Sequence, residues 1–333
     1  MRGKRQETPP VIDILLTSYR QPADWLYTAG SEAHGNFPGR DLLGTDAPPI
    51  LVCMNYAICN ETFVDWDHQR ICTCIASLGY CGLEVAPFTL GPKPTLIPMN
   101  ERLQFRETAE NAGLQIIGLH WLLAKTTGLH LTHPEPVIRE QTASYLVQLG
   151  KLCSDLGGSL MVLGSPLQRN RLPDISGAQA FEFALDTLQQ VMPRLGELGI
   201  RLCIEPLGTA ETNFINTCAE ANELIGAVNH PLCVLHLDVK AMAAECNTEN
   251  DGEAIAELIR REIHHTGHFH ANDPNRRGPG FGAMPFQPIM QALRQSHYAG
   301  WVSVEVFDYF PDPETIARES LQNMKRAAEA MEN

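Results

Sequence analysis

Four ionisable residues in the second half of the chain stand at the ends of short apolar segments, and their side chains suit metal binding and acid–base chemistry. Glu205 closes Leu-Cys-Ile-Glu, and Asp238 closes Val-Leu-His-Leu-Asp. His270 lies in His-Phe-His-Ala-Asn-Asp, and Glu305 lies in Val-Ser-Val-Glu-Val-Phe. Three carboxylates and one imidazole form an oxygen-rich ligand set for one divalent cation. We expect a bound cation, because three neighbouring carboxylates without one would raise each other's pKa. The expected ion is Mn²⁺, with Mg²⁺, Co²⁺ or Zn²⁺ as alternatives.

A regular alternation of apolar strands and amphipathic helices positions these four residues. The predicted strands are residues 50–55, 82–86, 115–121, 159–164, 201–205, 233–238, 268–271 and 302–306. The helical patterns between them are residues 66–78, 136–156, 178–198, 218–228, 254–264, 286–295 and 313–331. Strands that alternate with helices form parallel βαβ units, and eight units over about 280 residues have the size of a (β/α)₈ barrel.

A doubly wound sheet is the main competing fold. It usually carries a glycine-rich phosphate fingerprint after the first strand, whereas residues 54–62 read Met-Asn-Tyr-Ala-Ile-Cys-Asn-Glu-Thr. The pattern therefore favours an α/β fold of the TIM-barrel type, a single domain at residues 49–333 after an irregular N-terminal extension at residues 1–48. In such a barrel the active site lies at the C-terminal ends of the strands, where the four residues converge.

The composition argues against several classes of function. The chain has 333 residues, of which 44% are hydrophobic, and a formal net charge of −14, which repels nucleic acid. No apolar window approaches the length of a membrane span, and the N-terminus lacks the apolar region of a secretory signal. The ten cysteines are scattered through apolar segments, as is typical of reduced core thiols. We predict a cytoplasmic protein that binds neither nucleic acid nor a membrane.

The four residues also suit proton transfer next to a carbonyl group. Isomerising or epimerising a hydroxy-ketone requires the removal of a proton from the carbon beside the carbonyl. A divalent cation that chelates the carbonyl and a neighbouring hydroxyl stabilises the developing enediolate. A carboxylate on each side can then take the proton and return one. We predict that Glu205 and Glu305 form this catalytic pair, one for each face of the substrate, besides binding the metal.

Other strand ends supply candidate substrate contacts. Glu84 ends the second predicted strand, and His120 with Trp121 ends the third, where they are expected to line a sugar pocket. Tryptophan suits stacking on the apolar face of a sugar, although a core position is an equal alternative for Trp121. Gln168 and Arg169 follow the fourth strand, where we expect them to meet a distal hydroxyl or a phosphate.

Several of these segments resemble the xylose-isomerase-like TIM-barrel superfamily. They are residues 204–217, His-Leu-Asp, His-Phe-His-Ala-Asn-Asp, Val-Ser-Val-Glu-Val-Phe-Asp and Gly-Tyr-Cys-Gly-Leu-Glu-Val-Ala-Pro-Phe-Thr, the last beginning at residue 79. Within the superfamily they are most similar to the sugar isomerase/epimerase branch, which includes D-tagatose 3-epimerase and hydroxypyruvate isomerase. The resemblance covers about residues 50–330.

The resemblance implies a small-molecule sugar substrate and a homo-oligomer, either a dimer or a tetramer. It places the metal ligands of the family on Glu205, Asp238, His270 and Glu305, and its substrate-binding residues on Glu211 and Arg276.

One position departs from the pattern of that branch. Many of its epimerases place a histidine that binds the ketose three residues after the metal-binding aspartate, whereas this chain has Ala241. Either Lys240 or another group replaces that contact, or the substrate differs. A metal-dependent lyase of an oxidised sugar or cyclitol, similar to inosose dehydratases and to C-glycoside-cleaving enzymes, is therefore an alternative. A zinc apurinic endonuclease is a weaker alternative, because the chain has no basic stripe for DNA.

Overall fold

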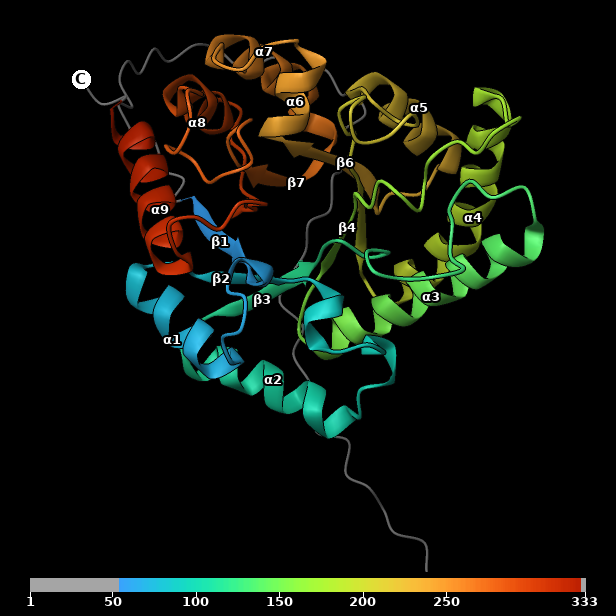
Figure 1. Ribbon diagram of the computed structural model, residues 1–333, viewed down its shortest axis with the longest axis horizontal. Helices are drawn as coiled ribbons and strands as arrows, with labels where there is room; N and C mark the ends of the chain where they lie inside the picture. The colour runs from blue at the N-terminus through green and yellow to red at the C-terminus, as the bar shows by residue number, and fades with distance from the viewer. Residues whose placement is uncertain (1–53, 331–333) are drawn as a thin grey trace, which may run out of the picture. The chain divides into compact units, whose positions relative to one another are not determined.

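Eight parallel strands close into a barrel in chain order, with β8 paired to β1, and helices surround it (Figure 1). The computed structural model describes residues 54–330. The strands are β1 Asn55–Cys59, β2 Gly82–Val85, β3 Gln115–Leu119, β4 Leu160–Leu163, β5 Arg201–Ile204, β6 Cys233–Asp238, β7 Thr266–Ala271 and β8 Trp301–Val304. This arrangement confirms the predicted (β/α)₈ fold. The predicted extension at residues 1–48 lies outside the described residues.

Each crossover between neighbouring strands contains helical turns. The α-helices are α1 His68–Leu78, α2 Met99–Asn111, α3 Pro136–Asp155, α4 Gly177–Glu197, α5 Cys218–Val228, α6 Val239–Glu245, α7 Gly252–Glu262, α8 Phe286–Gln295 and α9 Pro313–Glu329. The short 3₁₀ turns are η1 Asn60–Thr62, η2 Pro87–Leu90, η3 Pro94–Leu96 and η4 Ile263–His265. Among the residues described, no helix is both long and apolar enough to cross a membrane.

The strands divide their side chains between two environments. The main core lies between the strands and the helices and includes Phe269 of β7. A separate small cluster of Leu160, Val162 and Cys203 packs with the half-buried Val234. Because side chains alternate along a strand, His268 and His270 point to the face of β7 opposite Phe269. Because the strands of the closed barrel are parallel, the polar carboxyl ends of β5 to β8 lie together at one mouth.

The predicted position of the first strand is wrong. The prediction of residues 50–55 rested on the apolar run at residues 50–53, which lies outside the described residues, and the first barrel strand that the structure describes is β1, Asn55–Cys59. Residues 54–62, interpreted as the turn after that strand, contain β1 and η1. The position of β1 is fixed by long-range pairing, because Ala57 lies opposite Gly82 of β2 and Ser303 of β8.

Two helices have no counterpart among the predicted elements. Helix α2 carries few apolar residues, and its start is held by Arg102, whose guanidinium donates to the carbonyls of Thr95 and Ile97 and to the Asp155 carboxylate. Helix α6 follows β6 without a loop, because the side chain of Asp238 accepts a hydrogen bond from the backbone N–H of Ala241 as an N-cap. The predicted bounds of the other helices lie within two residues of those observed.

We expect the substitution Phe269→Ala to lower the free energy of unfolding by about 3–5 kcal/mol, because it empties a large volume in a fully buried position. Urea denaturation followed by circular dichroism measures this change. The control is Leu167→Ala, at a side chain that is 71% exposed, where the change should stay within about 0.5 kcal/mol. Equal losses in the two variants would contradict the placement of Phe269 in the core.

Candidate active site

The carboxyl ends of β5 to β8 bring the four predicted metal ligands together. Glu205 follows β5, Asp238 ends β6, His270 lies in β7 and Glu305 follows β8. Each of them is at most 5% exposed. One potential ligand atom from each residue lies within 4.8 Å of those of the other three. Four residues that are far apart in the sequence therefore form one compact cluster in the fold.

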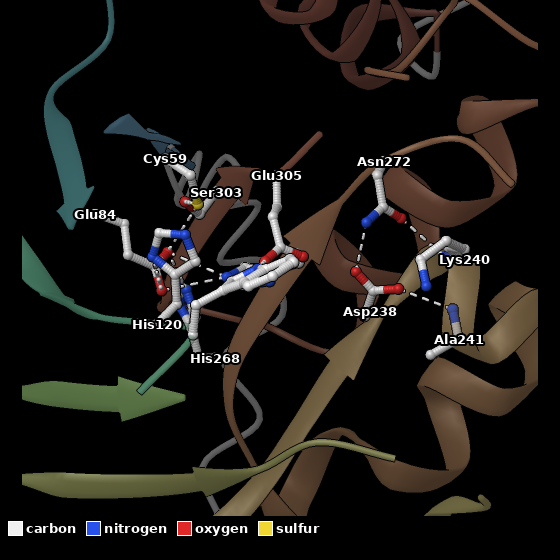
Figure 2. Close-up of polar contacts among 12 residues, drawn as sticks. Cys59, Glu84, His120, Asp238, Lys240, Ala241, His268, Asn272, Ser303 and Glu305 are labelled. Atoms are coloured by element: carbon white, nitrogen blue, oxygen red, sulfur yellow. Dashed lines mark hydrogen bonds and ion pairs between the residues drawn. The ribbon is translucent and has the colours of Figure 1, made fainter. Parts of the chain in front are cut away.

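Both oxygens of Asp238 have fixed partners (Figure 2). Oδ1 accepts the backbone N–H of Ala241 at 2.8 Å, and Oδ2 accepts Nδ2 of Asn272 at 2.5 Å. The other side-chain atom of Asn272, Oδ1, accepts the backbone N–H of Lys240 at 2.8 Å. Sequence patterns did not indicate Asn272, although it lies only two residues after His270. It joins the ends of β6 and β7 and orients the Asp238 carboxylate.

Glu305 is held from the opposite side of the barrel. Nε1 of Trp121 donates to Oε1 of Glu305 at 2.6 Å, and Nδ1 of His270 lies 3.2 Å from Oε2. Trp121 has a backbone φ of 53°, a left-handed conformation that is rare for a bulky residue. This strain turns the chain directly after β3 and is consistent with a functional position for the indole.

Glu205 is held through its backbone, and its side chain occupies a space left by glycine at the end of the neighbouring strand β4. Nη1 of Arg169 donates to the carbonyl oxygen of Glu205 at 2.6 Å, and Nη2 donates to that of Ile215 at 3.3 Å. Arg169 is 2% exposed, so the expectation that it meets a distal hydroxyl or phosphate is wrong. A methyl group at Gly164 would overlap Oε2 of Glu205, so glycine leaves the room that this carboxylate occupies.

A cavity of about 720 Å³ opens at this mouth of the barrel, and we call it the carboxylate cavity. It is lined by Glu205, Glu305, Trp121, Glu211, Lys240 and Arg276, among others. Nζ of Lys240 lies 2.5 Å from Oε2 of Glu211. The predicted substrate contacts Trp121, Glu211, Lys240 and Arg276 thus share one cavity with the two predicted catalytic glutamates.

The structure does not bring Glu84 or His120 to that cavity, contrary to expectation. Both side chains are fully buried. Oε2 of Glu84 lies 2.9 Å from Nε2 of His268 and 3.1 Å from Nε2 of His270. Nε2 of His120 lies 2.8 Å from Oε2 of Glu61. These residues form a polar layer inside the barrel that supports His270 from behind.

The buried charges of the cluster perturb one another. Burial, together with the facing Glu305 and Asp238, raises the pKa of Glu205 well above its usual value. Burial raises the pKa of Asp238 to about 6, against the opposing effect of Lys240. Burial alone would lower the pKa of His270, but Glu84 and Glu305 raise it well above its usual value. A divalent cation would relieve the carboxylate repulsion, so this donor set fits a metal.

Further groups of potential ligands overlap with this cluster. Glu84 groups with His268 and His270, and His236 groups with Glu205 and His270. Neither ring nitrogen of His236 has a hydrogen-bond partner within residues 54–330, and the side chain is fully buried. Burial lowers the pKa of His236 well below its usual value, as do the neighbouring His270 and His268, so the ring is neutral. The four-residue group at the strand ends combines the most carboxylates with access to the cavity.

Comparison with known proteins identifies the family. The profile of the xylose isomerase-like TIM barrel family matches residues 73–327. The chain belongs to this family. It is similar to the D-psicose 3-epimerase of Ruminiclostridium cellulolyticum, with 28% identity over 245 residues, or 72% of this chain and 78% of that protein. It is also similar to the D-psicose 3-epimerase of Enterocloster bolteae, with 26% identity over 243 residues, or 72% and 77%.

The same fold occurs in solved structures. A D-psicose 3-epimerase determined in the presence of D-fructose superposes with a TM-score of 0.70 at 21% sequence identity. The superposition covers 83% of this chain and 99% of that structure. At this identity the match shows the shared barrel alone.

We expect the substitution Glu84→Gln to lower the free energy of unfolding by about 3–5 kcal/mol, because it removes one partner of a buried charge pair with His270. Urea denaturation at pH 7 measures the loss. The matched control is Glu110→Gln in the exposed ion pair with Arg106, where the change should stay below about 1 kcal/mol. A loss at Glu84 no larger than that at Glu110 would show that the buried carboxylate does not support His270.

Proposed function

We propose that the protein is a divalent-metal-dependent epimerase or isomerase of a ketose or keto-sugar. The observation that carries this proposal is the convergence of Glu205, Asp238, His270 and Glu305 at the carboxylate cavity. Membership of the xylose isomerase-like family and the similarity to two D-psicose 3-epimerases support it. A cytoplasmic location and a homo-oligomeric state remain predictions from the sequence.

In the proposed site, Glu205, Asp238, His270 and Glu305 hold one divalent cation, with Mn²⁺ as the expected ion. When bound, this cation polarises the carbonyl of the substrate and offsets the negative charge that develops as a proton leaves the neighbouring carbon. The fixed hydrogen bonds of Asp238 and Glu305 orient these carboxylates before the substrate arrives. Such preorganisation lowers the reorganisation that the reaction requires.

The proton transfers are assigned to Glu205 and Glu305, which both line the carboxylate cavity. One carboxylate removes the proton from the carbon beside the carbonyl, and the other returns a proton. Return to the opposite face of the same carbon inverts its configuration and gives an epimer. Return to the former carbonyl carbon, with the proton of the neighbouring hydroxyl passing to the former carbonyl oxygen, moves the carbonyl and gives an isomer. The hydrogen bond from Trp121 holds one oxygen of Glu305 in place during this exchange.

The remaining polar residues of the cavity bind the hydroxyl groups of the sugar. Lys240 and Arg276 supply charged donors, and Glu211 supplies an acceptor that Lys240 already orients. Lys240 is assigned the contact that a histidine at position 241 makes in many epimerases of this branch, because Lys240 lines the cavity whereas Ala241 is buried in α6 and its backbone N–H donates to Asp238. His120 pairs with Glu61 and does not line the carboxylate cavity, so it is left out of the proposed substrate contacts.

Replacing Glu205 or Glu305 with glutamine should slow proton exchange by about 10²–10⁴-fold, because the acid–base group is lost. The measurement is deuterium incorporation into D-psicose in D₂O, followed by NMR, with each variant loaded with the same metal. This readout follows proton removal whether the product is an epimer, an isomer or the eliminated product of a lyase, and the NMR spectrum distinguishes these products. The control is Glu110→Gln, and a rate like that of the unsubstituted protein in either active-site variant would refute the assigned roles.

Elemental analysis of the purified protein should find about one Mn, Co or Mg ion per chain, as expected for one oxygen-rich site. Asp238→Asn and His270→Ala should each lose this ion while keeping the barrel's circular dichroism spectrum. Three zinc ions per chain would favour the endonuclease alternative. No bound metal after reconstitution would refute the proposed metal site.

A further inference from the structure

A second cavity, of about 640 Å³, adjoins the carboxylate cavity, and we call it the aromatic cavity. Trp121, Arg276 and Phe307 belong to the lining of both cavities. The aromatic residues of the second lining include Trp66, Phe88, Phe105 and Tyr309 besides Trp121 and Phe307. None of these six side chains is fully buried. Each therefore exposes part of its ring, while Arg70 covers one face of Trp66, Lys125 lies over Phe88, and His68 stacks on Phe105.

A row of rings connects the two cavities. The centroid of Phe88 lies 6.2 Å from that of Trp121 in an edge-to-face arrangement, and Trp121 lies 5.8 Å from Phe307. The same Trp121 donates its indole N–H to Glu305. Glu61, in the lining of the aromatic cavity, has a carboxylate oxygen within 4.8 Å of a potential ligand atom of Glu305. A ligand that reaches Glu305 is therefore within one ring's length of the aromatic cavity.

Several polar groups in the aromatic cavity already have partners within the protein. Nδ2 of Asn60 donates to Oγ1 of Thr89 at 2.7 Å, and Oδ1 of Asn60 accepts the backbone N–H of Ala86. The hydroxyl of Thr89 donates to the Ala86 carbonyl. Nε2 of His68 lies 2.8 Å from the carbonyl oxygen of Phe105. The lining also holds charged groups at Glu61, Asp65, Lys125 and Arg276, but an aromatic ring needs no hydrogen-bond partner and can pack against the partly exposed aromatic side chains.

The volumes of the two cavities also favour a ligand larger than one sugar. Each of the two cavities alone falls within the range of roughly 300–1,000 Å³ that holds a drug-sized ligand. A monosaccharide with its carbonyl between Glu205 and Glu305 would leave the aromatic cavity unfilled. A sugar that carries a ring substituent would occupy both cavities, with the substituent passing the wall made by Trp121 and Phe307.

We propose that the aromatic cavity binds an aromatic ring carried by the sugar, so that an aryl glycoside of a keto-sugar binds more tightly than a free ketose. The inference rests on the proposed function, because the carboxylate cavity takes the sugar part. Phe88 and Trp66 line the aromatic cavity alone and therefore determine affinity for the ring without taking part in proton transfer.

The test measures binding by calorimetry to the metal-loaded protein, using phenyl β-D-glucopyranoside and methyl β-D-glucopyranoside. Neither compound has a carbonyl group, so binding is separated from turnover. The phenyl compound should bind at least tenfold more tightly, which corresponds to about 1.4 kcal/mol and is within reach of aromatic contacts plus apolar burial. Phe88→Ala and, independently, Trp66→Ala should reduce this ratio to about threefold or less. Both variants should leave the dissociation constant of the methyl compound unchanged.

The matched control is Phe181→Ala in α4, an aromatic side chain that lines neither cavity and should keep the tenfold ratio. Equal affinities for the two glucosides, or no binding of the phenyl compound, would overturn the proposal. A tenfold ratio that survives in both Phe88→Ala and Trp66→Ala would also overturn it, because the ring would then bind elsewhere. A tenfold ratio that depends on Phe88, found together with no proton exchange on any keto-sugar, would support the aromatic site and count against the proposed enzyme activity.

Discussion

Repulsion among three buried carboxylates is the constraint on which the rest of the site depends. Glu205, Asp238 and Glu305 come within 4.8 Å of one another at the end of a barrel interior, where like charges interact more strongly than in water. Hydrogen-bond donors on the outer sides of these carboxylates offset part of the repulsion, as the side-chain amide of Asn272 does at Asp238. His270 is placed among them, and Glu84 and Glu305 raise its pKa well above its usual value against the effect of burial. The arrangement leaves the space between the carboxylates for a cation.

Two of the supporting side chains come from the first half of the barrel, opposite the clustered residues that they contact. The four clustered residues come from β5 to β8. Glu84, which contacts His270, lies in β2, and Trp121, which contacts Glu305, follows β3. A closed parallel barrel makes these contacts possible, because the carboxyl ends of all the strands meet at one mouth. The catalytic geometry therefore depends on closure between β8 and β1, and an open sheet would not oppose Trp121 to Glu305.

The sequence predicted those parts of the site that depend on local pattern. Each of the four clustered residues ends a short apolar run, so strand periodicity and barrel topology were enough to group them. The supports were not predictable in this way, because Asn272 carries no pattern of its own and acts through its partner on another strand. Arg169 was misjudged for a related reason: an arginine in a loop usually faces solvent, and only the fold shows three backbone carbonyls around it. The first strand was misplaced because pairing across the barrel seam, rather than the apolar run before it, determines its position.

Trp121 shows how the chemistry and the choice of substrate become linked in this barrel. Its left-handed backbone turns the chain after β3 so that one indole edge reaches Glu305 while the ring lines both cavities. A substituent on the sugar that packs against this ring would also press on the group that orients Glu305. Binding of the substituent, far from the reacting carbon, would then affect the position of the Glu305 carboxylate. Binding energy from the remote part of a substrate is most useful to catalysis when it is coupled to the reacting groups in this way.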